Sequence, residues 1–315
     1  MVWLIRRIAL SILMLWLVVT VIFLSLYIMP GDPVMLLLGA DGFAPDPAAV
    51  AALRAELGLD QPIYVQYLRK LWSLLHFDLG ISIVGDTPVI QDIARRLPRT
   101  LELVGVGALL SLIIGIPAGV RAGLKRGGGF DRIASAVTGF AQAVPVFVIG
   151  TILVLVLAQN LRLVPAGGYV DFAVDPARHI LLLLMPSTAI AVGLSAIVFR
   201  ITRASVLDVM PQDYVRTARA KGVPTARINS HHILRNALMP VVTVFALHVG
   251  TLLSGTVLVE FVFNWPGLSG MLISGVISRD YTVVTGVLTV TSAIFILINL
   301  LVDIVYSVLD PRVRR

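Results

Sequence analysis

Few residue patterns in this chain could carry chemistry on a nucleotide or a metal, and each of them is incomplete. A phosphate-binding loop ends in Gly-Lys-Ser or Gly-Lys-Thr, but the three lysines are followed by Leu71, Arg126 and Gly222. A helical zinc site needs His-Glu-x-x-His spacing, whereas His231 and His232 are adjacent and would point about 100° apart on a helix. Cysteine is absent, which excludes thiolate catalysis and disulfides. We therefore expect no metal or other cofactor in this chain.

A serine between glycines, in Gly267-Leu268-Ser269-Gly270, superficially matches the nucleophile motif of intramembrane serine proteases. Those enzymes take the proton with a histidine that lies later in the chain, but the last histidine here is His248, upstream of the serine. Backbone packing or a tight turn explains the glycines without catalysis. The protease alternative predicts that Ser269→Ala abolishes a cleavage, and we expect no such activity.

Ionisable residues inside apolar segments are costly and are by default suspected of function. Three are candidates for pathway or structural roles: His248 in the middle of an apolar run, and Glu260 and Asp303 near run ends, where we expect both carboxylates to be solvated. An ion-coupled secondary transporter is expected to bury more such groups and to show an inverted repeat. The sequence thus predicts a protein that is not an enzyme and that a partner drives. An ATPase-independent channel or secondary transporter is the alternative.

The elements that carry these residues are membrane helices. Of the 315 residues, 57% are hydrophobic and 14% are charged, with a mean hydropathy of +0.93, whereas soluble domains carry about 25% charged residues. A helix that crosses a bilayer needs about 20 apolar residues. Six uncharged runs meet this length and predict an all-α polytopic membrane fold with six transmembrane helices: Ile8–Met29, Leu103–Val120, Ile133–Leu161, Ile180–Phe199, Asn236–Val259 and Tyr281–Val302.

Prolines and glycines modify this pattern. Another uncharged run, Phe261–Ser278, contains Asn264-Trp265-Pro266-Gly267, which favours an interfacial turn or a re-entrant piece over a seventh span. Prolines inside the other runs predict kinks that suit a helix bundle able to rearrange: Pro117, Pro145, Pro186 and Pro240.

The distribution of charge predicts the orientation. The formal net charge is +7, and Lys and Arg gather on alternate loops rather than in one patch typical of nucleic-acid binding. With the N-terminus inside, the inner segments hold 16 of the 25 basic residues and a net charge of +12, against −4 outside. The positive-inside rule therefore predicts that both termini are cytoplasmic. The first run is longer than the apolar region of a signal peptide, so we expect it to be retained as a span.

Two segments between the runs are long enough to fold. The outer one, 31–99, carries three helix signatures, each with a capping Asp or Thr followed within two residues by proline, and predicts helices over 48–57, 63–75 and 88–98. This helical subdomain is either a cap on the membrane face or a docking surface for a soluble partner. The inner one, Arg200–Arg235, carries seven cations and predicts two short helices joined at Lys221-Gly222-Val223-Pro224.

Specific motifs in these segments resemble those of a known family. Tyr214-Val-Arg-Thr-Ala-Arg-Ala-Lys-Gly222, followed by Arg235-Asn-Ala-Leu-Met-Pro240, resembles the cytoplasmic coupling loop of ABC importer permeases of the dipeptide/oligopeptide/nickel family. The long outer segment is similar to that of the first, B-type member of the two paired permeases. Further motifs match along nearly the whole chain: Pro30-Gly-Asp-Pro33, Leu57-Gly-Leu-Asp60, Phe77-Asp-Leu-Gly80, Gly115-Ile-Pro-Ala-Gly119, Pro266-Gly267 and Asp310-Pro-Arg312.

The resemblance implies an ABC importer type I permease in a bacterial inner membrane. The chain would form half of a translocation pathway beside a paralogous permease subunit, with two cytosolic ATPases that bind ATP and Mg and a periplasmic substrate-binding protein. The implied parts are the N-terminus and first span (1–30), the outer loop (31–99), a permease core (100–308) that includes the coupling loop (200–240), and a cytoplasmic tail (309–315). Peptides, glutathione-like molecules, nickel chelates and opine- or sugar-like solutes are all implied cargoes.

In the resembled family, the two helices of the coupling loop dock into a groove on the ATPase, with Gly222 at the turn between them. The candidate coupling residues here are the small Ala218, Ala220 and Gly222, which suit close docking, the cations Arg216, Arg219 and Arg235, and Pro240. The loop departs from the general permease consensus, because Arg216 and Thr217 stand where Glu and Ala are expected, and Met239-Pro240 displaces a Leu-Pro.

Overall fold

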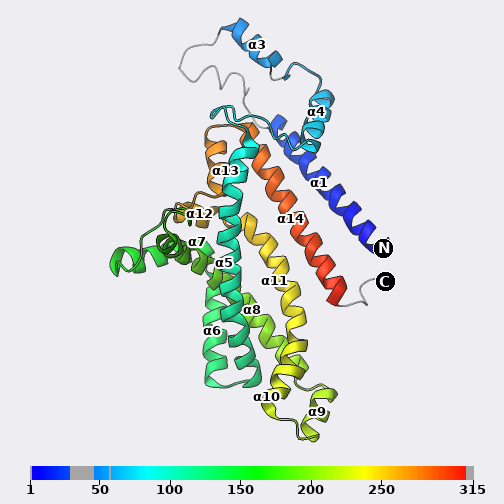
Figure 1. Cartoon of the computed structure of the whole chain (residues 1–315), viewed down its shortest axis with the longest axis vertical. Coiled ribbons are helices and arrows are strands. Elements are labelled where there is room, and N and C mark those ends of the chain that lie inside the picture. Colours follow the sequence, from blue (N-terminus) through cyan, green and yellow to red (C-terminus); the bar gives the residue numbers. More distant parts are fainter. Residues whose placement is uncertain (1, 29–45, 57, 310–315) are drawn as a thin grey trace. The chain divides into compact units, whose positions relative to one another are not determined.

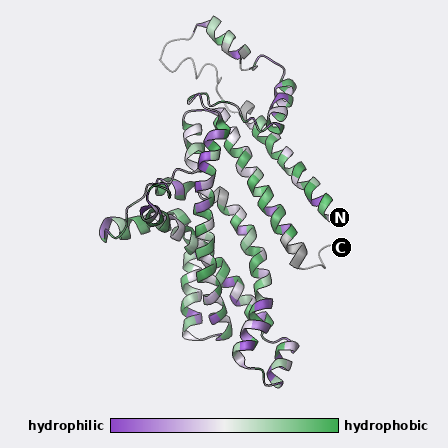
Figure 2. Cartoon of the chain, in the orientation of Figure 1, coloured by the Kyte–Doolittle hydropathy of each residue, from purple (hydrophilic) through white to green (hydrophobic). Residues whose placement is uncertain are grey.

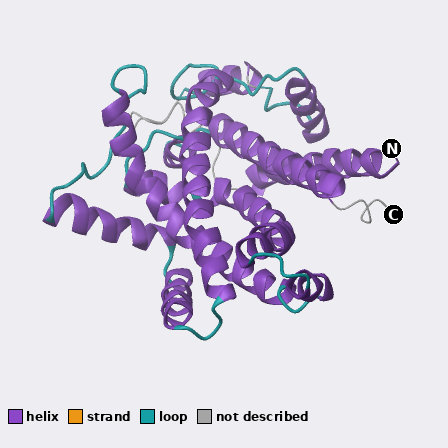
Figure 3. Ribbon diagram, turned by 60° about the horizontal axis from the view of Figure 1, so that its bottom comes forward, coloured by secondary structure: helices purple, strands orange, loops and turns teal. Residues whose placement is uncertain are grey.

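The computed structural model describes residues 2–28, 46–56 and 58–309, and this part of the chain consists of helices and their connections (Figures 1 and 3). Contacts divide the chain into two compact units, each taken separately below. Unit 1 comprises Met1–Leu4, Arg99–Pro266 and Leu297–Arg315, and unit 2 comprises Ile5–Pro98 and Gly267–Ile296.

The predicted all-α polytopic membrane fold is confirmed. Among the described residues, five helical segments are long and apolar enough to cross a bilayer, and a bent pair makes a sixth if it is counted as one span. Figure 2 shows the hydrophobic character of these helices, most continuously on α1 and α14. The five are α1 (Val2–Ile28), α5 (Val89–Leu124), α8 (Pro176–Val209), α14 (Tyr281–Leu309) and the continuous segment α10 (Thr225–Arg227), η2 (Ile228–Leu234) and α11 (Arg235–Gly255).

The third predicted run is broken rather than continuous. It consists of α6 (Gly129–Ala143) and α7 (Val146–Leu153), which continues as the π-helical η1 (Val154–Asn160), and the two parts are bent by 103°. Val144, before Pro145, has the extended backbone that proline imposes on its predecessor. The run expected over Ile133–Leu161 is therefore two helices that meet at Pro145, one of the four predicted kinks, whereas Pro117, Pro186 and Pro240 lie inside continuous helices.

Within unit 1, α5 packs closely on α8 through glycines spaced in multiples of four residues. A Cβ atom at Gly115 would lie 2.8 Å from Val198 Cβ, and one at Gly119 would lie 2.7 Å from both the carbonyl oxygen of Phe199 and Cβ of Thr202. Gly107 and Gly123 meet Ile190 and Val206 in the same way. Small residues at this spacing let membrane helices approach until their backbones touch, so this row sets the distance between α5 and α8.

Replacing Gly119 with leucine is expected to push α5 away from α8. The new side chain would meet backbone, which cannot move aside like a flexible side chain, and overpacking of this kind costs about 1–3 kcal/mol. Thermal unfolding of the purified protein in detergent measures the loss. Gly105→Leu is the matched control on the same helix, because no atom lies within 4 Å of a Cβ there. Equal unfolding temperatures for the two variants would contradict the packing argument.

Unit 2 contains most of the outer segment, and the structure confirms two of its three predicted helices. These are α3 (Pro47–Glu56), where the Asp46 side chain accepts from the Ala48 N–H at 3.1 Å, and α4 (Ile63–Leu75).

The third predicted helix of the outer segment was expected to end at Pro98, which is wrong, because α5 runs on to Leu124. Proline removes one backbone donor and frees the carbonyl four residues earlier. Pro98 and Ala94 are both exposed, so the free carbonyl remains accessible to a polar partner.

Asp280 holds the connection before α5 onto the start of α14. Its Oδ2 accepts from the Ser82 hydroxyl at 2.6 Å and from the Val84 N–H at 3.3 Å, while Oδ1 caps α14 through the Val283 N–H at 3.1 Å. The run expected not to be a seventh span, Phe261–Ser278, contains the last two residues of α12 (Val257–Val262) and all of α13 (Leu268–Ile277). The ten residues of α13 would span about 15 Å, half of a hydrocarbon core.

Candidate functional site

The predicted coupling loop contains a short helix and a sharp turn. Helix α9 (Asp213–Ala220) ends where Gly222 adopts a left-handed backbone, with φ of +71°. The Gly222 N–H donates to the Arg219 carbonyl at 3.0 Å, and the Val223 N–H donates to the Ala218 carbonyl at 3.2 Å. This hydrogen-bond pair is a Schellman motif. The predicted stop at Gly222 and the restart after Pro224, which precedes α10, are therefore confirmed.

The polar segment is shorter than expected, because the neighbouring helices extend into it. Helix α8 continues to Val209, so Arg200 and Arg203 lie on that helix, and a continuous helical segment begins at Thr225. Only 15 residues, 210–224, connect the two. The second short helix of the prediction is thus the first part of the α11 segment, which joins the turn directly to a transmembrane helix.

One face of α9 is anchored in the chain's own core. Val215 and Ala218 are buried in a cluster with Val206 from α8 and with Ile228, Ile233 and Ala237 from the η2–α11 segment. A polar contact supports this packing, since the Asn236 amide donates to the Tyr214 hydroxyl at 3.1 Å. Ala218, which we expected on the docking face, therefore packs against its own chain. The small residues that remain exposed are Ala220 and Gly222.

The remaining surface of α9 and the turn are exposed and basic. The exposed cations are Arg216, Arg219, Lys221, Arg227 and Arg235, and Figure 2 shows the hydrophilic character of the region around α9 and α10. Arg216 lies 3.6 Å from Asp213, in a pair whose side chains are 73% and 97% exposed and which therefore contributes little to stability. Pro240 is exposed on α11, in the second turn of that helix. The arrangement is a helix that is anchored on one face and carries exposed positive side chains on the rest of its surface.

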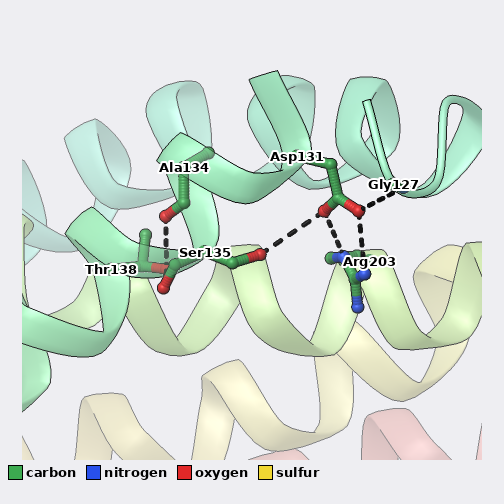
Figure 4. Close-up of polar contacts among 6 residues, drawn as sticks. All are labelled: Gly127, Asp131, Ala134, Ser135, Thr138 and Arg203. Atoms are coloured by element: carbon green, nitrogen blue, oxygen red, sulfur yellow. Dashed lines mark hydrogen bonds and ion pairs between the residues drawn. The ribbon is translucent and has the colours of Figure 1, made fainter. Parts of the chain in front are cut away.

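A buried ion pair lies close to this region in unit 1 and was not predicted. The Asp131 carboxylate, 3% exposed, accepts from Nε and Nη2 of Arg203 on α8 at 2.5 and 2.9 Å, and from the Gly127 N–H at 2.9 Å (Figure 4). The Ser135 hydroxyl donates to the same carboxylate at 3.4 Å. The pair fastens the start of α6 and the turn before it to α8. In the sequence, the signal for this ion pair was a single acidic residue next to glycines in an otherwise basic segment.

Glu260 differs from its prediction. We expected a solvated carboxylate, but Glu260 on α12 is 1% exposed and accepts from the Thr100 hydroxyl of α5 at 2.6 Å. The neighbouring Trp265 is also buried, and its indole N–H donates to the Arg99 carbonyl at 3.0 Å. The solvated-carboxylate interpretation is wrong because the chain folds back at Phe263–Gly267 and brings α12 against the α5 backbone.

A second buried polar contact involves His179, a residue that was not among the candidates predicted from the sequence. His179 on α8 is 2% exposed, with Nε2 2.8 Å from Glu102 Oε1 and Nδ1 2.7 Å from the Val170 carbonyl oxygen. The rings of Tyr169 and Trp265 approach its imidazole edge-on, with centroids at 5.6 and 5.9 Å. Together with Glu260, these residues form a polar and aromatic cluster away from the α9 surface.

The two other ionisable candidates lie elsewhere. His248 is half-buried on α11, and Asp303 is half-buried on α14. Neither belongs to the cluster around Glu260 and His179. Within the described part of the chain, no group of three or more His, Asp or Glu side chains is arranged to hold a metal ion.

Comparison with known proteins matches both parts of the chain. Residues 115–315 match the family model of the binding-protein-dependent transport system inner membrane component, and residues 1–104 match the model of the N-terminal region of such components. The dipeptide transport system permease protein DppB of Escherichia coli (strain K12) is 38% identical, with 93% of this chain and 92% of that protein covered. A putative peptide transport system permease protein of Brucella abortus (strain 2308) is also 38% identical, with 98% of both chains covered.

A solved structure has the same fold. The chain aligns with a chain of the MetNI methionine ABC transporter in an inward-facing conformation, with a TM-score of 0.59 and 19% sequence identity. The alignment covers 71% of this chain and 98% of that one.

Proposed function

The chain belongs to the family of binding-protein-dependent transport system inner membrane components, and we propose that its α9 turn receives the movement of a cytosolic ATPase. The chain is a permease subunit of an ATP-binding-cassette importer, and the ATPase is a separate subunit. It is a multi-pass protein of the inner membrane, and it works with ATPase and binding-protein partners. The ATPase-independent alternative has no support in these relatives.

The observation that carries the coupling proposal is the two-sided character of α9. Val215 and Ala218 tie one face to α8 and to the η2–α11 segment, so a force on α9 reaches two transmembrane helices directly. Arg216 and Arg219, beside this anchored face, remain exposed. A partner that binds this face would therefore move the base of the bundle rather than a loose loop.

The remaining partners follow from this assignment. We infer that the complex has two ATPases, a paralogous permease subunit that completes the pathway, and a periplasmic binding protein that delivers the cargo. The excess of basic residues on the α9 side supports a cytoplasmic location for this surface and for both termini. Peptides are the proposed cargo, because the two relatives compared above are named as dipeptide and peptide permeases.

Charge reversal at Arg219 tests the docking face. Arg219→Glu is expected to weaken binding of the ATPase subunits to the permease by about tenfold, since a like charge at an interface costs on the order of a kcal/mol or more. Co-purification titrated against ATPase concentration measures the change. Arg178→Glu, an exposed arginine at the other end of the bundle near the start of α8, is the matched control. If both variants retain the ATPase equally well, the docking face is assigned wrongly.

A further inference from the structure

Helix α4 in unit 2 has an apolar face that the chain leaves uncovered. Tyr64, Leu68, Trp72 and Leu75 follow one another at spacings of four, four and three residues, so they form one stripe. Their exposed fractions are 67%, 61%, 66% and 74%. A contiguous stripe of large apolar and aromatic side chains on a helix surface marks a binding or membrane-contact face.

The neighbouring face of α4 is covered by the chain itself. Tyr67 packs on Phe23 of α1, with ring centroids 5.3 Å apart, and its hydroxyl lies 2.6 Å from Thr20 Oγ1. The Thr20 hydroxyl donates to the Trp16 carbonyl at 2.7 Å. A threonine has one hydroxyl proton, so Tyr67 donates and Thr20 accepts. This hydrogen bond determines which side of α4 meets α1. The stripe lies on the neighbouring side of the helix and is not covered by this contact.

The contact with α1 also fixes the depth of α4 in the membrane. Thr20 lies inside the apolar span Trp3–Ser25, five residues before its end. Those five residues correspond to about 8 Å along the helix axis. The Tyr67 hydroxyl is therefore below the end of a membrane-spanning helix, and the backbone of α4 lies at the level where hydrocarbon meets headgroups. Figure 1 shows α4 beside the end of α1 that is distant from the N-terminus.

We propose that α4 is an interfacial helix that inserts the stripe Tyr64, Leu68, Trp72 and Leu75 into the outer leaflet of the bilayer. The occupant is lipid rather than protein because α4 packs on α1, a span in whose most apolar stretch only 6% of the residues are buried within the chain, so that α1 and the stripe face the same surroundings. Trp and Tyr with leucines on one face and cations on the other are typical of helices that lie in the headgroup region.

The charged residues of α4 support this orientation. Arg69 lies on the polar side of the helix and is exposed. Lys70 turns toward its own chain, where its ammonium donates to the Leu79 carbonyl at 3.4 Å; burial lowers the pKa of this group, and the nearby Asp78 opposes the shift. The stripe itself contains no charge.

Phe77 extends the apolar surface past the end of α4. It occupies a left-handed backbone position, with φ of +57°, where a helix usually ends in glycine. Its ring is 80% exposed, so it gains little from contacts within the chain. A lipid environment for this ring gives a reason for a bulky residue in that conformation.

Site-directed spin labelling tests the proposal, because the chain has no cysteine of its own. Leu68→Cys and Leu75→Cys report on the stripe, and Arg69→Cys is the matched control one residue away on the polar side. The labelled permease is studied in its complete complex with cysteine-free partners, in vesicles of phosphatidylethanolamine and phosphatidylglycerol. Retained ATP-driven uptake shows that each labelled variant is folded.

Lipid contact predicts frequent collisions with oxygen and rare collisions with a water-soluble nickel complex. The ratio of the two is expected to be about tenfold higher at Leu68 and Leu75 than at Arg69, because a polar reagent is strongly excluded from hydrocarbon. Frequent nickel collisions at the stripe would place it in water and overturn the proposal. Rare collisions with both reagents would show that another protein subunit covers the stripe, which would overturn it equally.

Discussion

Replacing Gly222 with valine is expected to reduce ATP-driven uptake by the assembled complex by roughly tenfold or more. A left-handed backbone costs a non-glycine residue about 1–2 kcal/mol, and a β-branched one at the upper end of that range. Gly222 has a φ of +71° between α9 and α10. The variant would therefore adopt another backbone conformation there, which would rotate the exposed surface of α9 away from the ATPase. Uptake of radiolabelled dipeptide into proteoliposomes, together with ATP hydrolysis, measures the effect.

A second substitution, Gly222→Asn, distinguishes the effect of backbone strain from the effect of adding a side chain. Asparagine tolerates the left-handed region better than other non-glycine residues, and among the described residues, apart from the two chain neighbours, no atom lies within 4 Å of a Cβ at Gly222. Gly222→Asn is therefore expected to retain most of the uptake. Wild-type uptake by Gly222→Val would show that this turn is not needed for coupling, and the assignment of α9 would be wrong.

Asp131→Ala is expected to destabilise the permease by about 2 kcal/mol. The substitution leaves Arg203 without its bidentate partner and the Gly127 N–H without its acceptor. Removing one partner of a fully buried pair costs roughly 3–5 kcal/mol. We expect less here because the Arg203 side chain is 29% exposed and water can solvate part of its charge. The midpoint of thermal unfolding of the purified complex measures the change.

Two further variants make this prediction specific. Asp208→Ala removes an exposed carboxylate from the same helix as Arg203 and is expected to change stability by less than about 0.5 kcal/mol. The double variant Asp131→Leu with Arg203→Met replaces the pair by apolar side chains of similar size and is expected to recover most of the loss. A double variant as unstable as Asp131→Ala would mean that the loss arises from local packing and not from an unpaired charge.

Local sequence features were enough to predict some parts of the structure. The end of α9 followed from Gly222 and Pro224, because a positive φ and a missing backbone donor act on the residues next to them. The same kind of reasoning predicted a kink at Pro145 but failed for Pro98, where a helix end was expected. Both prolines precede or lie within apolar helices, yet α5 continues through Pro98 while the chain turns by 103° at Pro145.

The buried polar contacts likewise could not be predicted from local sequence. Asp131 and Arg203 are 72 residues apart in the chain, and Thr100 and Glu260 are 160 residues apart. Reading Glu260 as an interfacial, solvated carboxylate was reasonable from its place at the end of an apolar run. The structure buries it because the turn at Phe263–Gly267 brings α12 back against α5, and no local pattern specifies which helix a turn will meet.

By itself, the sequence determined the membrane as solvent, the approximate extent of the apolar helices, the segments in which basic residues gather and the turn at Gly222. These properties depend on hydropathy summed over about 20 residues, on charge, and on the backbone preferences of single residues. The tertiary structure alone decided which helices touch, which acids are buried, that the third run bends by as much as 103°, and that the apolar stripe on α4 stays uncovered. Such features depend on which faces of distant helices meet, and that choice belongs to the packing of the whole chain.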